Sequence, residues 1–146
     1  MHERMNGRLP REARLRGHDV FGRIFRQSEG LRRGELVVKY RIEKEPPAGA
    51  PATGVRAGFV VRRSAGTAVR RNRIRRLLRE AYRTKRMSFV KALPSGMNLD
   101  LVVLWSGTPE QALRPSFEAI EGEMGAALNA IVGRLRKRAD GRAEQR

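Results

Sequence analysis

The chain has 146 residues, of which 32 are Lys or Arg and 15 are Asp or Glu, so its net charge is +17. That length suits one domain with a single core, and the charge excess predicts a polyanionic partner. Cysteine is absent, which excludes disulfides, thiolate catalysis and cysteine-based zinc sites.

The partner indicated by this charge is a nucleic acid rather than a membrane. No apolar run approaches the roughly 18 residues of a membrane-spanning helix. The N-terminal stretch is basic and lacks the apolar centre of a secretory signal, which favours a cytoplasmic protein. The composition divides the chain into a basic extended arm at 1–16, one domain at 17–135 and a basic, disordered tail at 136–146.

The domain opens with a helix and a strand. An i, i+1, i+4, i+5 stripe of Val20, Phe21, Ile24 and Phe25 predicts a short amphipathic helix, which Gly30 would end or follow with a loop. Residues 35–44 then alternate in the period of a half-buried strand. The apolar face of this strand is formed by Leu36, Val38, Tyr40 and Ile42, and the opposite, cationic face by Val37, Lys39 and Arg41.

The remaining elements follow a loop rich in Pro, Gly and Ala at 45–54. We expect a strand at 55–63, an arginine-rich helix from Ala68, a strand at 99–105 that is covered on both sides, and a helix at 115–135. The order helix, strand, strand, helix, strand, helix predicts an α+β fold, a small α/β sandwich with the helices packed on one sheet. The sheet should include both strands that flank the arginine-rich helix.

The segment "AVRRNRIRRLLREAYR", residues 68–83, carries Glu80 as its only acid. On a helical wheel, Ile74, Leu77, Leu78, Ala81 and Tyr82 share one sector, and Asn72, Arg75, Arg76, Arg79 and Arg83 lie opposite. Arg73 falls on the flank. Repeated like charges three and four residues apart are unfavourable in an isolated helix, and guanidinium groups match phosphate geometry. The pattern therefore favours contact with the backbone of a nucleic acid over the alternative of a solvated basic face.

Asn72 is the exception within this arginine row. Asn disfavours helix interiors but suits a first turn, where its side chain can bond either the backbone or RNA. The sequence leaves both roles open, a helix cap and an RNA contact.

The same segment resembles a known family. It is similar to the arginine-asparagine-arginine signature of the protein subunit of bacterial ribonuclease P, usually G-x-A-V-x-R-N-R-x-K-R-x-x-R-E. The matching positions are Gly66, Ala68, Val69, Arg71, Asn72, Arg73, Arg75, Arg76, Arg79 and Glu80. The likeness extends over roughly residues 9–135, through "LPREARLRGHDVFGRIFRQ", "RAGFVVRRSAG" and "LDLVVLW".

The resemblance implies a ribosomal-protein-like superfold in which the signature helix crosses between parallel strands with left-handed sense. It implies a protein that binds the catalytic ribonuclease P RNA in a 1:1 complex. This protein would promote removal of the 5′ leader from precursor tRNA. The RNA would carry the chemistry with bound Mg²⁺. The implied RNA-binding residues are Arg62, Arg63, Arg71, Asn72, Arg73, Arg75, Arg76 and Arg79.

The resemblance also implies a cleft for the single-stranded leader, lined by Phe21, Phe25 and Lys39. The two rings could instead belong to the core. Val20 and Ile24 lie in a neighbouring sector of the helix and could fill the core by themselves, which would leave the rings free to line the cleft. The family has an aromatic residue where this chain has Lys39, whereas Tyr40 lies on the opposite face, so which of the two lines the cleft stays open. The family's Ser-Lys-Lys after the central strand reads "RRS" at 62–64, which keeps the charge but alters its placement.

No protein-borne catalytic or metal site is visible in the sequence. His2 and His18 have no evident partner, Asp100 is expected to stand alone in its strand, and the glutamates of the last helix are expected to form a solvated face. The alternative functions are a ribosome-associated RNA-binding protein without a role in cleavage, and nonspecific DNA compaction.

Overall fold

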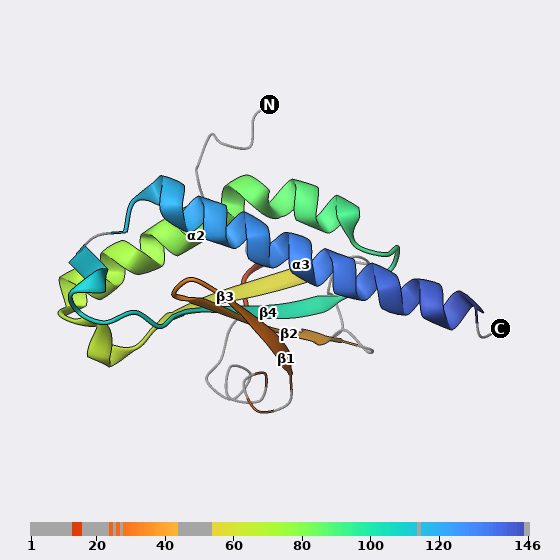
Figure 1. Cartoon of the computed structure of the whole chain (residues 1–146), viewed down its shortest axis with the longest axis horizontal. Helices are drawn as coiled ribbons and strands as arrows, with labels where there is room; N and C mark the ends of the chain where they lie inside the picture. Colours follow the sequence, from red (N-terminus) through yellow and green to blue (C-terminus); the bar gives the residue numbers. More distant parts are fainter. Residues whose placement is uncertain are drawn as a thin grey trace.

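The computed structural model describes residues 13–15, 24, 26, 28–43, 54–113 and 115–144 (Figure 1). Its elements are β1 (Glu29–Arg33), β2 (Leu36–Ile42), β3 (Val55–Val61), the 3₁₀ turn η3 (Arg63–Ala65), α2 (Ala68–Ala92), β4 (Leu99–Trp105), the 3₁₀ turn η4 (Gln111–Leu113) and α3 (Phe117–Glu144). Ile24 and Arg26 are helical, as expected of the first helix, whose other residues lie outside the described part.

The four strands form one sheet in the order β1-β2-β4-β3. β1 pairs with β2 and β2 with β4 in antiparallel fashion, whereas β3 and β4 are parallel neighbours. Since α2 connects β3 to β4, the strands that flank the arginine-rich helix do lie side by side, and the predicted α+β sandwich is confirmed. The hand of this crossover stays a prediction.

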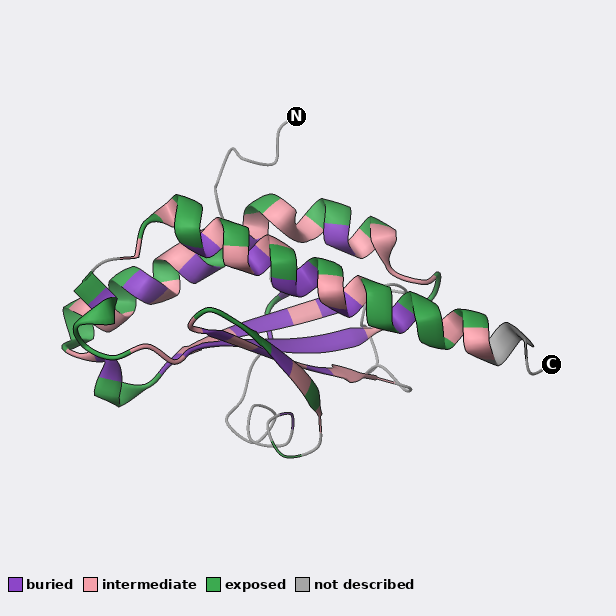
Figure 2. Cartoon of the chain, viewed as in Figure 1, coloured by how far each residue is buried: buried purple, intermediate pink, exposed green. Residues whose placement is uncertain are grey.

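Helices α2 and α3 cover one face of the sheet, and their buried residues face it (Figure 2). The alternation in β2 is confirmed, because Leu36, Val38 and Tyr40 are buried in this core. All seven residues of β4 are buried, as expected of an interior strand. The core from α3 consists of Ile120, Met124, Ala127, Leu128, Ile131 and Leu135.

The opposite face of the sheet is covered by residues near the N-terminus. Leu15 and Ile24 pack on Val102 in a second, smaller cluster. The Leu15 backbone N–H donates to the carbonyl of Ala57 at 3.0 Å, so residues 13–15 pair with the free edge of β3. This pairing covers the backbone of β3 around Ala57, where the edge would otherwise be open. The expected arm at 1–16 therefore joins the domain at its last residues.

Strand β1 was not predicted by the sequence. Residues 29–33 contain one large apolar side chain, Leu31, so neither the helical nor the strand period is visible there. The turn to β2 has Gly34 at φ 58°, a conformation that favours glycine, and a Cβ on Gly34 would collide with the Glu123 carboxylate. Gly30, expected to end the first helix, lies within β1.

Helix α3 continues to Glu144, beyond the boundary at residue 135 that the sequence indicated. The residues after 135 lack an apolar face, but their arginines reach other elements. Arg136 Nε donates to the carbonyl of Ala92 at 2.8 Å, and Arg138 pairs with Glu29. The disordered tail predicted for 136–146 is therefore wrong up to residue 144, because polar contacts replace the missing apolar stripe.

Asp100 does not stand alone as the sequence indicated. It is buried in β4, and Arg56 of the neighbouring β3 donates to both carboxylate oxygens, at 2.9 and 3.0 Å. A bidentate guanidinium compensates a buried carboxylate well. The pair therefore ties the two parallel strands together on the sheet face away from α2 and α3.

We expect Arg56→Leu to lower the free energy of unfolding by about 3 kcal/mol, because it leaves the Asp100 carboxylate buried without its partner. Arg56→Leu combined with Asp100→Leu should recover most of this loss, since no buried charge remains. Urea unfolding followed by circular dichroism measures both. Arg32→Leu, an exposed strand arginine, should cost less than about 1 kcal/mol, and equal losses for Arg56→Leu and Arg32→Leu would contradict this account.

Candidate RNA interface

The arginine-rich helix begins at a well-formed cap. Thr67 is the N-cap residue of α2, and its hydroxyl accepts a hydrogen bond from the Arg70 backbone N–H at 3.3 Å. Gly66 precedes it with φ 127°, which favours glycine. The capping role considered for Asn72 is therefore wrong, because the cap lies five residues earlier.

The two faces of α2 are those that the sequence predicted. Ile74, Leu78, Ala81 and Tyr82 are buried, and Leu77 is half-buried. The Tyr82 hydroxyl has no hydrogen-bond partner in the described part of the chain, and burial raises its pKa, so it stays neutral. The Tyr82 ring packs against Phe59 of β3, with ring centroids 5.7 Å apart. Apolar packing therefore sets the rotation of α2 about its axis.

The outer face of α2 carries Asn72, Arg75, Arg76 and Arg79, which we call the arginine face. Asn72, Arg76 and Arg79 are exposed and Arg75 is half-buried. The Asn72 side-chain oxygen accepts a hydrogen bond from Arg75 Nη1 at 2.9 Å. The amide therefore holds one guanidinium of the row in a defined position.

The arginine face concentrates positive charge. Partial burial lowers the pKa of Arg79, and the nearby guanidiniums of Arg14 and Arg75 lower it further. These like charges repel the Arg79 guanidinium, and an anion placed among them would relieve the repulsion. The arginine face is therefore suited to phosphate oxygens.

Arg14 was missed by sequence reasoning. It lies in the segment that pairs with the edge of β3, and its guanidinium lies close enough to Arg79 to affect that residue's pKa. The alternation of Arg14 with the buried Ala13 and Leu15 is a strand-like signal, but it spans only three residues. Arg14 thus adds a cation from outside α2 to the arginine face.

The other predicted arginines occupy different environments. Arg62 and Arg63 are exposed at the end of β3, where η3 leads into α2. Arg71 is half-buried, and its Nε is buried with no hydrogen-bond partner among the described residues. Arg73 donates from Nη2 to the carbonyl of Pro115 at 2.9 Å, so it attaches α2 to the segment before α3. Arg83 is paired with Glu80 at 2.6 Å.

The predicted leader-binding residues are only partly described. Lys39 lies on the sheet face that carries Val102, and its side chain lies over Gly30, where a Cβ would be 2.7 Å from Lys39 Cδ. Tyr40 is buried on the core face and donates to Glu29 at 3.1 Å. Tyr40 therefore cannot line a cleft on the opposite face. Phe21 and Phe25 lie outside the described residues.

The part of the chain that the structure describes contains neither a membrane-spanning helix nor a cluster of metal ligands. None of its helices is long and apolar enough to cross a membrane. No group of three or more His, Cys, Asp or Glu side chains gathers there as a metal site would require.

A guanidinium row on a firmly packed helix of a small α+β domain is typical of a protein that binds nucleic acid. The Ribonuclease P family model matches residues 9–132. A ribonuclease P protein component from Streptomyces avermitilis is 35% identical over 129 residues, which cover 87% of this chain and 94% of the relative. One from Chlorobaculum tepidum is 37% identical over 94 residues, which cover 64% of this chain and 60% of the relative.

The solved structure of the RNase P protein from Thermotoga maritima superposes with a TM-score of 0.62 at 28% identity, covering 79% of this chain and 94% of that one. The chain therefore belongs to the ribonuclease P protein family, as the signature in residues 66–80 indicated. Membership makes it an RNA-binding subunit of the enzyme that processes the 5′ ends of precursor tRNA. The family associates with ribonuclease P RNA and with tRNA precursors.

We expect Arg79→Gln to weaken binding to ribonuclease P RNA and to make it less salt-dependent. Loss of one phosphate contact should reduce the slope of log affinity against log salt by roughly 0.7–0.9. Filter binding between low and moderate salt measures the slope. Arg83→Gln is the matched control on the same helix, because that guanidinium is already paired with Glu80. Equal changes in slope for the two variants would show that the arginine face has no special role.

Proposed function

We propose that the arginine face binds ribonuclease P RNA in a 1:1 complex in the cytoplasm, together with Arg62, Arg63, Arg71 and Arg73. The observation that carries this proposal is the placement of Asn72, Arg75, Arg76 and Arg79 on one outward surface, above a fully buried set of apolar side chains. A rigid row of forked donors suits the fixed phosphate spacing of a folded RNA.

The second part of the proposal is that Phe21, Phe25 and Lys39 hold the 5′ leader of precursor tRNA. Two observations support it. Ile24 is buried against Val102, so it supplies core packing between the first helix and the sheet. Lys39 is directly opposite Val102 in the strand register and lies on the same sheet face. A cation beside the segment that carries two aromatic residues suits a single strand, whose bases stack and whose phosphates need neutralising.

We further propose that Mg²⁺ is the cofactor and that the RNA binds most of it and performs the cleavage. The described residues offer no cluster of metal ligands, and the arginine face would repel a bare cation. Hydrated Mg²⁺ is instead held well by RNA phosphates. The role of the protein is then to neutralise the surrounding phosphates, so that RNA and substrate approach with less repulsion.

Reconstitution tests the proposed function against a ribosome-associated role, which would use the same electrostatics without cleavage. The protein is mixed with bacterial ribonuclease P RNA and precursor tRNA at physiological salt and low Mg²⁺, and leader release is measured. We expect strong stimulation over the RNA alone, because the protein reduces the Mg²⁺ needed to hold the substrate. An absence of stimulation at every Mg²⁺ concentration would remove cleavage from the function.

Binding measurements on the reconstituted complex separate the leader cleft from the arginine face. Phe21→Ala combined with Phe25→Ala should weaken binding of precursor tRNA more than binding of mature tRNA, since only the precursor carries a leader. Stacking on an aromatic side chain contributes roughly 1–3 kcal/mol per base. Equal losses for both tRNAs would place the two rings in the core instead.

A further inference from the structure

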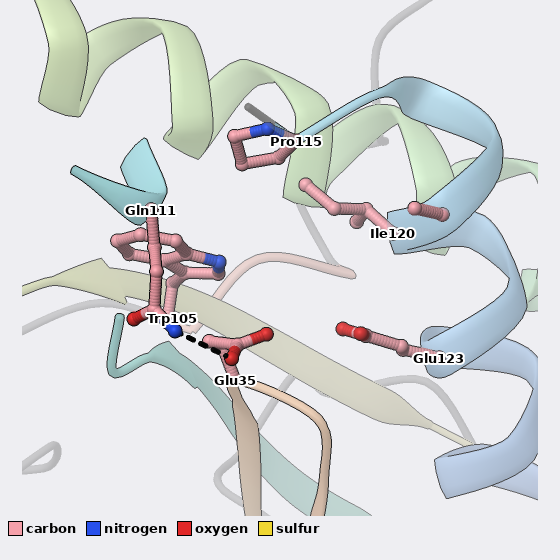
Figure 3. Close-up of a pocket in the computed structure, with 7 residues that line it drawn as sticks. Glu35, Trp105, Gln111, Pro115, Ile120 and Glu123 are labelled. Atoms are coloured by element: carbon pink, nitrogen blue, oxygen red, sulfur yellow. Dashed lines mark hydrogen bonds between the residues drawn. The ribbon is translucent and has the colours of Figure 1, made fainter. Parts of the chain in front are cut away.

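A pocket of about 280 Å³ lies between the β1–β2 turn, the end of β4, η4 and the start of α3 (Figure 3). It is lined by Glu35, Trp105, Gln111, Pro115, Ala119, Ile120 and Glu123. Pockets for drug-sized ligands have volumes of roughly 300–1,000 Å³, so this one suits a single planar ring system. None of these residues belongs to the arginine face or to the leader cleft described above.

Two carboxylates face each other in this pocket. Figure 3 shows the Glu35 and Glu123 side chains pointing toward one another. Gln111 Nε2 donates to Glu35 at 3.0 Å, whereas no described residue donates to the Glu123 carboxylate. Burial raises the pKa of Glu123, and the nearby charge of Glu35 raises it further. A neutral donor group placed beside Glu123 would satisfy it.

Trp105 supplies an independent polar group. The residue as a whole is 2% exposed. No described residue accepts a hydrogen bond from its indole N–H, and this nitrogen is not one of the fully buried polar atoms, so it is accessible from the pocket. In Figure 3 the indole nitrogen is on the side that faces Ile120 and Glu123, so the N–H points into the pocket. The pocket therefore offers one donor and a carboxylate acceptor, both unused within the protein.

A guanidinium or ammonium ion matches this arrangement poorly. Such a cation would pair with Glu123, but it has no acceptor for the indole N–H. The net charge of +17 also opposes its approach over long range. The occupant should instead be a neutral planar ring with adjacent N–H donors and one carbonyl oxygen. Guanine has this pattern, with N1–H and the N2 amino group as donors and O6 as acceptor.

The pocket adjoins the helix that carries the arginine face. Arg73 of α2 donates to the carbonyl of Pro115, and Pro115 forms part of the pocket wall. An RNA whose phosphates lie along α2 can therefore reach this pocket with an unpaired base. Sequence-specific RNA recognition commonly uses such unpaired bases.

We propose that this pocket binds one unpaired guanine of an RNA held by the arginine face, with Glu123 accepting from N1–H and the N2 amino group and the Trp105 N–H donating to O6. Pro115 and Ile120 pack against the ring. This inference rests on the proposed function, because it takes RNA to be the partner. It adds a base-specific contact to a surface that otherwise reads only the phosphate backbone.

Trp105 is the only tryptophan in the chain, so its fluorescence reports on the pocket directly. Three single-stranded RNA heptamers, uridines with a central guanine, inosine or adenine, are titrated into the full-length protein at fixed salt. We expect the guanine heptamer to change Trp105 fluorescence and to bind at least about fivefold tighter than the adenine heptamer. Inosine, which lacks the N2 amino group, should be intermediate.

Glu123→Gln should abolish the preference for guanine over adenine, whereas Glu118→Gln, an exposed neighbour on α3, should retain it. Glu35→Gln is a second pocket variant, and circular dichroism confirms folding in each case. Equal affinity for the three heptamers, a preference that survives Glu123→Gln, or stronger quenching by arginine amide than by guanosine would overturn the proposal. Loss of the guanine preference alongside normal leader release in reconstitution would leave the proposed function intact, whereas absent leader release would overturn that function separately.

Discussion

The structure depends on the burial of one face of α2. Ile74, Leu78 and Ala81 are fully inaccessible, and Tyr82 lies against Phe59 of the sheet. Repulsion along the arginine face is unfavourable for the helix by itself, and this apolar contact offsets it. A helix anchored in this way cannot rotate to spread its charges. The guanidiniums of the arginine face therefore repel one another in the free protein, and a bound anion would reduce this repulsion.

Contacts with neighbouring elements also hold the first half of α2 in place. Thr67 begins the helix on a hydrogen bond, and Arg73 ties its first half to the segment that precedes α3. Arg14, from the strand-like segment on the β3 edge, adds a further cation beside Arg79. The RNA-binding surface is thus formed by several elements, although a single helix carries most of it.

The sequence predicted the elements whose periodicity is strong. The wheel of α2 and the continuous apolar run of β4 required only local spacing, and both are confirmed. It failed for β1, because a strand with Leu31 as its one large apolar residue has no period, and for α3 after residue 135, where arginine contacts with distant backbone replace an apolar stripe. Both elements depend on contacts with residues far away in the sequence, which local spacing does not reveal.

Of the two candidate sites, one could be predicted from the sequence and the other could not. The arginine face could be predicted because its residues belong to one helix, and the signature of the family covers them. The pocket could not, because Glu35, Trp105 and Glu123 come from three elements that only the folded chain brings together. Asp100 shows the same limit, since its partner Arg56 precedes it by 44 residues.

Arginine-selective chemical modification tests the central claim most directly. The protein is treated with a phenylglyoxal reagent, alone and in complex with ribonuclease P RNA, and the extent of modification at each arginine is measured by mass spectrometry. The account predicts that Arg75, Arg76 and Arg79 lose reactivity in the complex, while the exposed Arg33 of β1 keeps it. Undiminished reactivity of the arginine face in a fully formed complex would contradict it.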